Sequence, residues 1–359
     1  MPIRYVILRK GTSSLAGTLA SKGQAMPITA QFDTLGGPEK IKLVDVPVQP
    51  PAADEVQIRM RAAGLNRAEL LYVAGHYLVE PPIPNAPLGA EGAGEIITVG
   101  SGVSEFAEGD RVCVLPMMDW AQYGTLAGIV NVPAHALEPI PDGIGFEDAA
   151  AFWMAYTTAY GMIVQAGEMP LNAAGRTVLI TGASSSVGTA AFQILKQIGA
   201  TSIGTTRTQK KVDDLNKAGA DHVIVTDDED IGARLKEITN GKGVDLVCDS
   251  VVGDMIAPAA EALVPEGNMV LMGFQSGEIP GLPFYPILTK GITIRGFHLV
   301  WHLLDHADRR RRAVDFLGPL WASGELKPVI DRVFPLSDVS GAYAYMATNN
   351  HLGKIVIQI

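Results

Sequence analysis

The chain has 359 residues, with 28 basic and 38 acidic side chains and a formal net charge of −10. Its content of 47% hydrophobic and 18% charged residues is typical of a globular protein long enough for two domains. The acidic balance argues against nucleic-acid binding, which needs a basic face, and no apolar run reaches the roughly 18 residues of a membrane span. The two cysteines, Cys113 and Cys248, lie in apolar strand-like runs and are predicted to be buried thiols.

The first 25 residues differ from the rest. They are basic, contain no acid and are rich in Ser, Gly and Ala. A targeting segment, an upstream extension and an artefact are all compatible with this composition. We therefore leave residues 1–25 out of the fold prediction.

Short strands and turns fill the sequence from residue 28 to about 141. Val56, Ile58 and Met60 alternate with polar residues, as in a half-buried strand, and Gly and Pro mark frequent turns. This texture predicts a β-barrel-like domain. Residues 146–164 contain helix-forming residues and no proline, so they predict one long helix that bridges to the next domain.

Strands then alternate with helices, beginning with a strand at 176–181. Such alternation predicts a parallel, doubly wound sheet. The closing strand KIVIQI follows this block and is expected to return to the first domain. The predicted domains are residues 26–150 with 310–359, and residues 151–309.

A glycine-containing turn, TGASSSVG, follows the first strand of the α/β block. The usual G-x-G-x-x-G pattern of a dinucleotide site reads Ala183-x-Ser185-x-x-Gly188 here. A preceding strand and a following helix support a pyrophosphate-binding turn, where the helix N-terminus supplies free N–H groups. An ordinary tight strand-to-helix turn is the alternative.

The next strand ends in TTRTQKK, without the acid that holds the ribose of NAD. Thr206, Arg207 and Lys211 supply a hydroxyl and cations that suit a 2′-phosphate. We therefore expect NADP(H) rather than NAD(H). Incidental lysines at a solvated helix start are the alternative.

These features together resemble the medium-chain dehydrogenase/reductase superfamily, over nearly the whole chain from Met26. The most specific segments are AAGLNRAELL, PLGAEGAGEIITVGSGV, LITGASSSVG, GADHVI, GKGVDLVCDSVVG and GKIVI. Within it the chain resembles the zinc-free quinone oxidoreductase branch. The resemblance implies a GroES-like β-barrel domain completed by the C-terminal strands, plus a Rossmann domain.

The same matching bears on metal binding. Zinc-using members carry a cysteine and a histidine where this chain has Asn66 and Ala90, with Glu91 retained. Alanine cannot bind zinc and asparagine binds it poorly, so no metal site is predicted. His298, His302 and His306 have helical spacing, but the first is expected in a sheet strand, where that spacing has no meaning.

The resemblance also implies the residues of the site. Asn66 would donate to the acceptor oxygen or the nicotinamide ribose, with a structural turn role as the alternative. Tyr77 would act as a hydrogen-bond or proton donor, or only as a wall of the cleft. The cofactor groove would be formed by Thr157, Ser185, Ser186, Val187, Thr206, Arg207, Lys211, Ser250, Gly273, Phe274, Phe297 and Lys354.

The predicted function is zinc-independent reduction of a quinone or α,β-unsaturated carbonyl by hydride from NADPH, in a cytoplasmic enzyme with a small-molecule electron acceptor. The alternatives are an enoyl-thioester reductase and a non-catalytic NADP-binding scaffold. The segment GITIRGF ends the α/β series, so it should be a sheet edge through which a homodimer forms. No nucleic-acid or membrane partner is expected.

Overall fold

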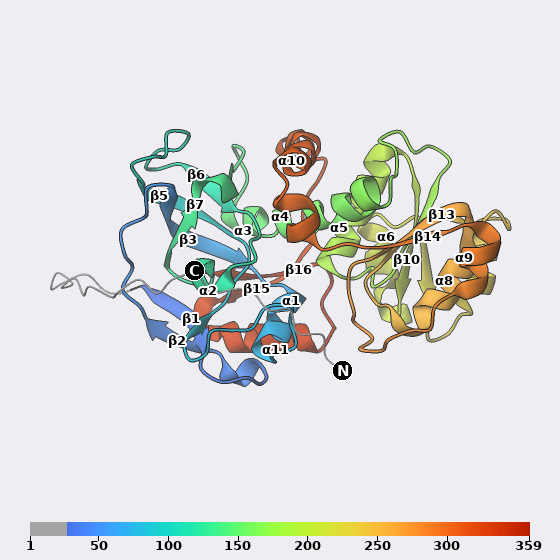
Figure 1. Cartoon of the computed structure of the whole chain (residues 1–359), viewed down its shortest axis with the longest axis horizontal. Coiled ribbons are helices and arrows are strands. Elements are labelled where there is room, and N and C mark those ends of the chain that lie inside the picture. Colours follow the sequence, from blue (N-terminus) through green and yellow to red (C-terminus); the bar gives the residue numbers. More distant parts are fainter. Residues whose placement is uncertain (1–26) are drawn as a thin grey trace.

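The structure is a computed structural model that describes residues 27–359, so the prediction for residues 1–25 lies outside the described residues. The chain forms two lobes, with α4 (Trp153–Tyr160) and β16 (Lys354–Gln358) running between them (Figure 1). The predicted fold class, a β-barrel domain followed by a doubly wound parallel sheet, is confirmed. No described helix combines the length and apolar character that crossing a membrane demands.

The first lobe is built on an antiparallel core around β3. Val56, Ile58 and Met60 of β3 are 0, 0 and 1% exposed, which confirms the predicted alternation. Strand β16 pairs antiparallel with β3, so the closing strand returns to the first domain as expected. The elements are β1 (Ile28–Phe32), β2 (Lys42–Asp45), β3 (Glu55–Gly64), α1 (Arg67–Val73), β4 (Ala86–Pro87), β5 (Gly92–Val99), β6 (Arg111–Val114), α2 (Trp120–Tyr123), β7 (Ile129–Pro133), β8 (Leu137–Pro139), β15 (Ile330–Pro335), α11 (Val339–Ala347) and β16 (Lys354–Gln358).

The second lobe is a six-stranded parallel sheet in the order β11-β10-β9-β12-β13-β14, flanked by helices. Strand β14 is an edge of this sheet, as predicted for GITIRGF. Its elements are β9 (Thr177–Ile180), α5 (Ser186–Ile198), β10 (Thr201–Thr206), α6 (Val212–Lys217), β11 (His222–Val225), α7 (Ile231–Ile238), β12 (Val244–Asp249), α8 (Ile256–Ala262), β13 (Leu263–Leu271), α9 (Phe284–Lys290) and β14 (Thr293–Gly296).

The single bridging helix predicted over residues 146–164 is wrong. The segment forms α3 (Phe146–Ala150), then α4 (Trp153–Tyr160), then a π-helical turn (Gly161–Ala166). The break has a tertiary cause, because the Met154 amide at the start of α4 donates to Glu91 Oε2 at 3.0 Å. Helix propensity depends on residues near in sequence and therefore does not predict this contact.

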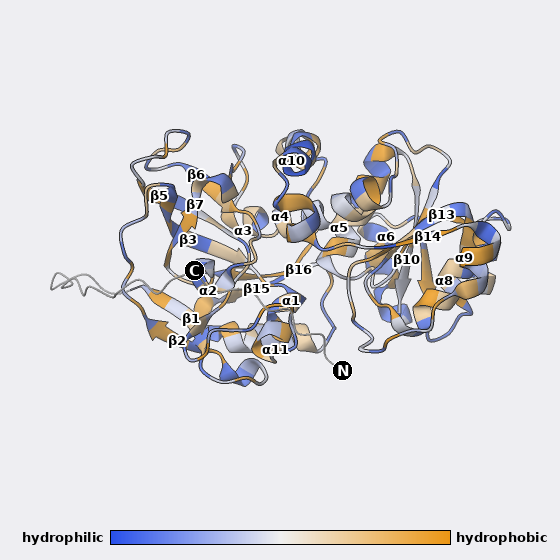
Figure 2. Ribbon diagram, viewed as in Figure 1, coloured by the Kyte–Doolittle hydropathy of each residue, from blue (hydrophilic) through white to orange (hydrophobic). Residues whose placement is uncertain are grey.

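Helix α10 (Ala307–Ala322) lies over the junction between the lobes (Figure 1). Trp321 near its end stacks on Phe152 with ring centroids 4.4 Å apart. The start of α10 carries the arginine run 309–312 and is hydrophilic, whereas orange apolar residues gather on the strands and on α4 (Figure 2). Arg309 and Arg310 donate to the carbonyls of His302 and Leu304, both at 2.7 Å, whereas Arg311 and Arg312 are exposed.

Candidate active site and cofactor groove

The predicted pyrophosphate turn joins β9 to α5 with the expected local geometry. Ser185 caps α5, since its Oγ accepts a hydrogen bond from the Gly188 amide at 3.1 Å. Gly182 has φ +59°, which suits glycine, and a Cβ on Gly188 would clash with the Ala183 carbonyl. Ser186 and Val187 form the first turn of α5, so the turn presents small residues and a helix N-terminus together.

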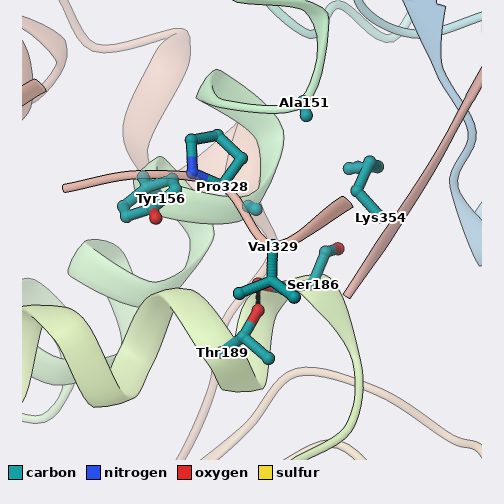
Figure 3. Close-up of a pocket in the computed structure, with 8 residues that line it drawn as sticks. Ala151, Tyr156, Ser186, Thr189, Pro328, Val329 and Lys354 are labelled. Carbon is teal, nitrogen blue, oxygen red and sulfur yellow. Dashed lines mark hydrogen bonds between the residues drawn. The ribbon is translucent and has the colours of Figure 1, made fainter. Parts of the chain in front are cut away.

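The turn lies against the C-terminal strand of the other lobe. The Gly353 amide donates to the Ser184 carbonyl at 2.9 Å, which places Lys354 beside the start of α5. Figure 3 shows the small pocket at this junction, where Ser186, Thr189 and Lys354 lie near one another. Residues from both lobes therefore meet at the predicted cofactor turn.

Lys354 forms a buried ion pair with Glu91. Its Nζ lies 2.6 Å from Glu91 Oε1, and each side chain is 1% exposed. The ammonium also donates to Asn66 Oδ1 at 2.8 Å and to the Leu65 carbonyl at 3.4 Å. Three acceptors therefore surround a group with three N–H donors.

Asn66 completes this cluster with both of its amide hydrogens. Its Nδ2 donates to the Gly64 carbonyl at 3.1 Å and to Glu91 Oε1 at 3.2 Å. The predicted donation from Asn66 to an acceptor or ribose stays a prediction. In this structure the amide instead holds Glu91 and Lys354 together.

These residues do not fit a zinc ion. Ala90 offers no ligand atom, and the Glu91 carboxylate already holds the ammonium of Lys354. Within residues 27–359 no group of three or more His, Cys, Asp or Glu side chains is arranged to hold a metal. The local positive charge comes from Lys354, so we derive no chemical step through a metal.

Glu69 is a buried acid that the sequence prediction missed. Its Oε2 accepts from the backbone N–H of Asn66 at 2.8 Å and from Tyr343 Oη at 2.9 Å. Oε1 has no partner among the residues that the structure describes. Burial, the dominant cause, raises the pKa of Glu69 to about 7.

Replacing Glu69 with glutamine is expected to change the pH dependence of stability. The folded-state pKa lies above the ordinary value of 4.5, so the folded state binds the proton more tightly and loses stability as pH rises from about 4.5 to about 7. The free energy of unfolding of Glu69→Gln, measured relative to that of wild type, should therefore be about 2–3 kcal/mol higher at pH 8 than at pH 5. Urea denaturation at both pH values measures this gain. Parallel pH dependences for the two proteins would exclude the titration of Glu69.

Tyr77 follows α1 and is locked against Trp120. The two rings stack with centroids 4.9 Å apart and an interplanar angle of 6°. Burial mainly, and Glu69 secondarily, raise the pKa of Tyr77 to about 12, so the phenol is protonated at neutral pH. A recess of about 250 Å³ lies next to this stack, lined by Tyr72, Val79, Glu80, Met118, Asp119, Trp120 and Ala121.

The polar partner of Tyr77 is His298, with its Nε2 3.3 Å from Tyr77 Oη. His76, the neighbour in sequence, is exposed. The expectation that His298 lies in a sheet strand is wrong, because β14 ends at Gly296 and the chain turns there into a π-helical segment (Val300–Leu304). Only the fold reveals this contact, since the residues are 221 positions apart.

The three residues predicted to bind the 2′-phosphate differ in their exposure and in whether other protein groups already bond to them. Thr206 is 9% exposed at the end of β10, whereas Arg207 is exposed. The Lys211 ammonium donates to Ser184 Oγ at 3.1 Å and to the carbonyls of Asn349 and His351 at 2.8 and 2.7 Å. Burial lowers the pKa of Lys211, and its contacts tie the two lobes together.

Several other predicted groove residues have structural partners. Ser250 Oγ donates to the Thr181 carbonyl at 3.0 Å. A Cβ on Gly182 would come within 2.6 Å of Ser250 Oγ. A Cβ on Gly273 would clash with the Ser250 carbonyl, so this glycine allows a close backbone approach. Phe274 is 51% exposed.

Two further predicted residues lie in α4 or against its end. Thr157 is buried and donates its hydroxyl to the Trp153 carbonyl. The Phe297 ring packs on Gly161, where a Cβ would overlap the ring. The structure thus places Phe297 against the end of α4.

Comparisons with known proteins agree with this arrangement. Residues 52–142 match the model described as "Alcohol dehydrogenase GroES-like domain", and residues 186–317 match "Zinc-binding dehydrogenase". Quinone oxidoreductase of Pseudomonas aeruginosa is 31% identical over 331 residues, which cover 91% of this chain and 98% of that protein.

Solved structures give the same result. Escherichia coli quinone oxidoreductase complexed with NADPH superposes with a TM-score of 0.84 at 30% identity, over 92% of this chain and 100% of that one. The CurK enoyl reductase superposes with a TM-score of 0.81 at 25% identity, over 93% and 99% of the two chains. With a GroES-like and a Rossmann domain and these relatives, the chain belongs to the medium-chain dehydrogenase/reductase superfamily of oxidoreductases, in its quinone oxidoreductase-like branch.

Proposed function

We propose that this protein reduces quinones or α,β-unsaturated carbonyls with hydride from NADPH and without zinc. The observation that carries the proposal is the buried Lys354–Glu91 pair, which puts an ammonium where zinc-using relatives need ligands. Without a Lewis acid, nothing stabilises the alkoxide of an unactivated alcohol. A conjugated acceptor spreads the charge of the incoming hydride over its own atoms and needs less help.

The residues fit a dinucleotide at the β9–α5 turn. Gly182 and Gly188 allow a close backbone approach, and Ser185 and Ser186 begin a helix whose N-terminus suits a pyrophosphate. When bound, NADPH supplies the hydride. The chain's own contribution is to orient the nicotinamide near Thr157, exclude water from the lobe junction, and offer the Tyr77 hydroxyl to the acceptor oxygen.

An acceptor panel tests the proposal. We expect NADPH consumption at 340 nm with at least one simple quinone or enone, and none with saturated primary alcohols and NADP⁺. Activity that appears only when zinc is added and disappears with a chelator would contradict the zinc-free mechanism.

A second candidate is an enoyl-thioester reductase. It is favoured by Tyr77, a protonated donor held rigidly at the cleft, because an enoyl thioester needs a proton after hydride addition. The likeness to the CurK enoyl reductase supports including such substrates. Comparing enoyl thioesters with quinones at equal NADPH separates the two. A scaffold without activity is separated by titrating NADPH fluorescence in the absence of an acceptor.

Arg207→Ala is expected to reduce the preference for NADPH over NADH at least ten-fold. Arg207 is exposed at the end of β10, and a charge-assisted bond to the 2′-phosphate is worth about 1.5–3 kcal/mol. Lys211→Ala should change the preference less, because its ammonium already has three acceptors. The ratio of kcat/KM for the two cofactors measures both effects. The reverse ranking would mean that Lys211 releases its carbonyls to hold the phosphate.

We also expect a homodimer through β14. Its residues Thr293–Gly296 form a sheet edge with unpaired backbone groups, and pairing with the same strand of a second copy satisfies them. Light scattering should give twice the mass of 38.0 kDa. A monomer at micromolar concentration would contradict this interface.

A further inference from the structure

The hydrogen bond between Tyr77 and His298 joins the two lobes. Tyr77 follows α1 in the barrel domain, and His298 follows β14 in the parallel-sheet domain. We propose that His298 is a positioning residue, which donates from Nε2–H to Tyr77 Oη and thereby aims the phenolic proton at the acceptor. This inference rests on the proposed reductase function.

The direction of the hydrogen bond follows from the other ring nitrogen. Nδ1 of His298 lies 3.4 Å from the Trp301 amide nitrogen, and a backbone N–H can only donate. Nδ1 must therefore accept, which puts the proton of a neutral imidazole on Nε2. Oη of Tyr77 is then the acceptor across the 3.3 Å contact.

The surroundings of His298 disfavour the charged imidazolium. Burial is the main cause that lowers the pKa of His298, and nearby His302 lowers it further, whereas Asp305 opposes them. The Trp301 ring packs on the imidazole with centroids 4.4 Å apart. Tyr77 also faces the imidazole, and its high pKa keeps it uncharged at neutral pH.

Two contacts then fix where the Tyr77 proton points. Stacking on Trp120 holds the plane of the ring, and the hydrogen bond from His298 occupies an oxygen lone pair. The O–H is left to donate elsewhere, toward a bound acceptor. As the proton leaves, Nε2–H stabilises the developing phenolate charge.

The proton balance is simple. Hydride from NADPH adds to the β-carbon of an enone, the resulting enolate takes the proton of Tyr77, and the phenolate regains a proton from water. His298 keeps its own proton throughout. A quinone acceptor, whose oxygens take protons from water after hydride transfer, does not depend on this step.

The first test does not depend on activity. Nitrogen NMR of protein labelled with ¹⁵N-histidine separates protonated from unprotonated ring nitrogens, and His298→Gln assigns the His298 signals. We expect Nε2 protonated, Nδ1 unprotonated, and a shift of the Nε2 signal in Tyr77→Phe. A proton on Nδ1, or an Nε2 signal unmoved by Tyr77→Phe, would overturn the proposal even if the enzyme reduced no tested acceptor.

The second test uses steady-state kinetics with an enone. His298→Leu removes the donor and should lower kcat about ten-fold with little change in KM, the value of one hydrogen bond to a developing charge. His298→Gln keeps an N–H at a similar reach and should stay within about three-fold of wild type. His76→Leu, at an exposed neighbouring histidine, is the matched control.

A double-mutant cycle completes the design. In the Tyr77→Phe background, His298→Leu should have no further effect on kcat, because His298 acts through the Tyr77 hydroxyl. An equal loss in both backgrounds, or an equal loss with quinone and enone, would assign His298 a general structural role instead. Absence of all NADPH-dependent reduction in wild type would refute the proposed function, and the NMR result would still decide the hydrogen bond.

Discussion

Lys354→Met is expected to lower the free energy of unfolding by about 3–5 kcal/mol, because it leaves the Glu91 carboxylate buried without its partner. Both side chains are 1% exposed, so water cannot replace the lost contact. The remaining donors to Glu91 Oε1 and Oε2 are neutral amides, from Asn66 and Met154. Urea denaturation at neutral pH measures the loss.

A surface ion pair supplies the matched control. Arg61 and Glu95 lie 2.7 Å apart, but their side chains are 44% and 35% exposed. Arg61→Met should therefore cost no more than about 1 kcal/mol. Adding Glu91→Gln to Lys354→Met should recover much of the stability, since the uncompensated charge is then gone.

The same variant separates two roles for Lys354. The family resemblance implied a place for it in the cofactor groove, whereas in the structure its three donors bond to Glu91, Asn66 and the Leu65 carbonyl. A Lys354→Met protein with wild-type stability and a raised KM for NADPH would show that the ammonium serves the cofactor alone. A loss of stability would support its role as the fixed positive charge of the site.

The fold was readable from the sequence where local pattern and burial coincide. The alternation at Val56, Ile58 and Met60 reflects one face of β3 in the core, and the strand–helix alternation reflects a parallel sheet. The bridging helix was misjudged because its break depends on Glu91, which lies 63 residues from Met154. Propensity describes neighbours in sequence and does not include such contacts.

The site was readable in its residue types but not in its pairings. The residue type and position of Lys211 indicated a phosphate-binding cation. Two of its acceptors, however, are backbone carbonyls 138 and 140 residues away, and no pattern of side chains in the sequence indicates such contacts. Glu69 could have been suspected, because it is an acid within the apolar run AELL. The role of His298 could not have been predicted, because it depends on a turn after β14 that brings His298 to Tyr77.

Tyr77→Phe keeps the ring and removes only the hydroxyl. For an enone or enoyl thioester we expect turnover to fall at least ten-fold, because general acid catalysis contributes about 10²–10⁴-fold. Quinone turnover should survive within several-fold, since both quinone oxygens can take protons from water. Stacking on Trp120 does not need the hydroxyl, so folding should be unaffected.

The comparison with a second tyrosine makes the result specific. Tyr345→Phe also removes a hydroxyl, one that donates to Asp331 at 3.0 Å and makes no contact with Tyr77 or His298, and should leave both activities unchanged. The pH profile adds a further check: with the pKa of Tyr77 raised to about 12, its proton is present throughout the neutral range, so enone turnover should not fall through loss of this acid below about pH 10. If Tyr77→Phe reduces enones and quinones as fast as wild type, the tyrosine is only a wall of the cleft, and the proton must come from water.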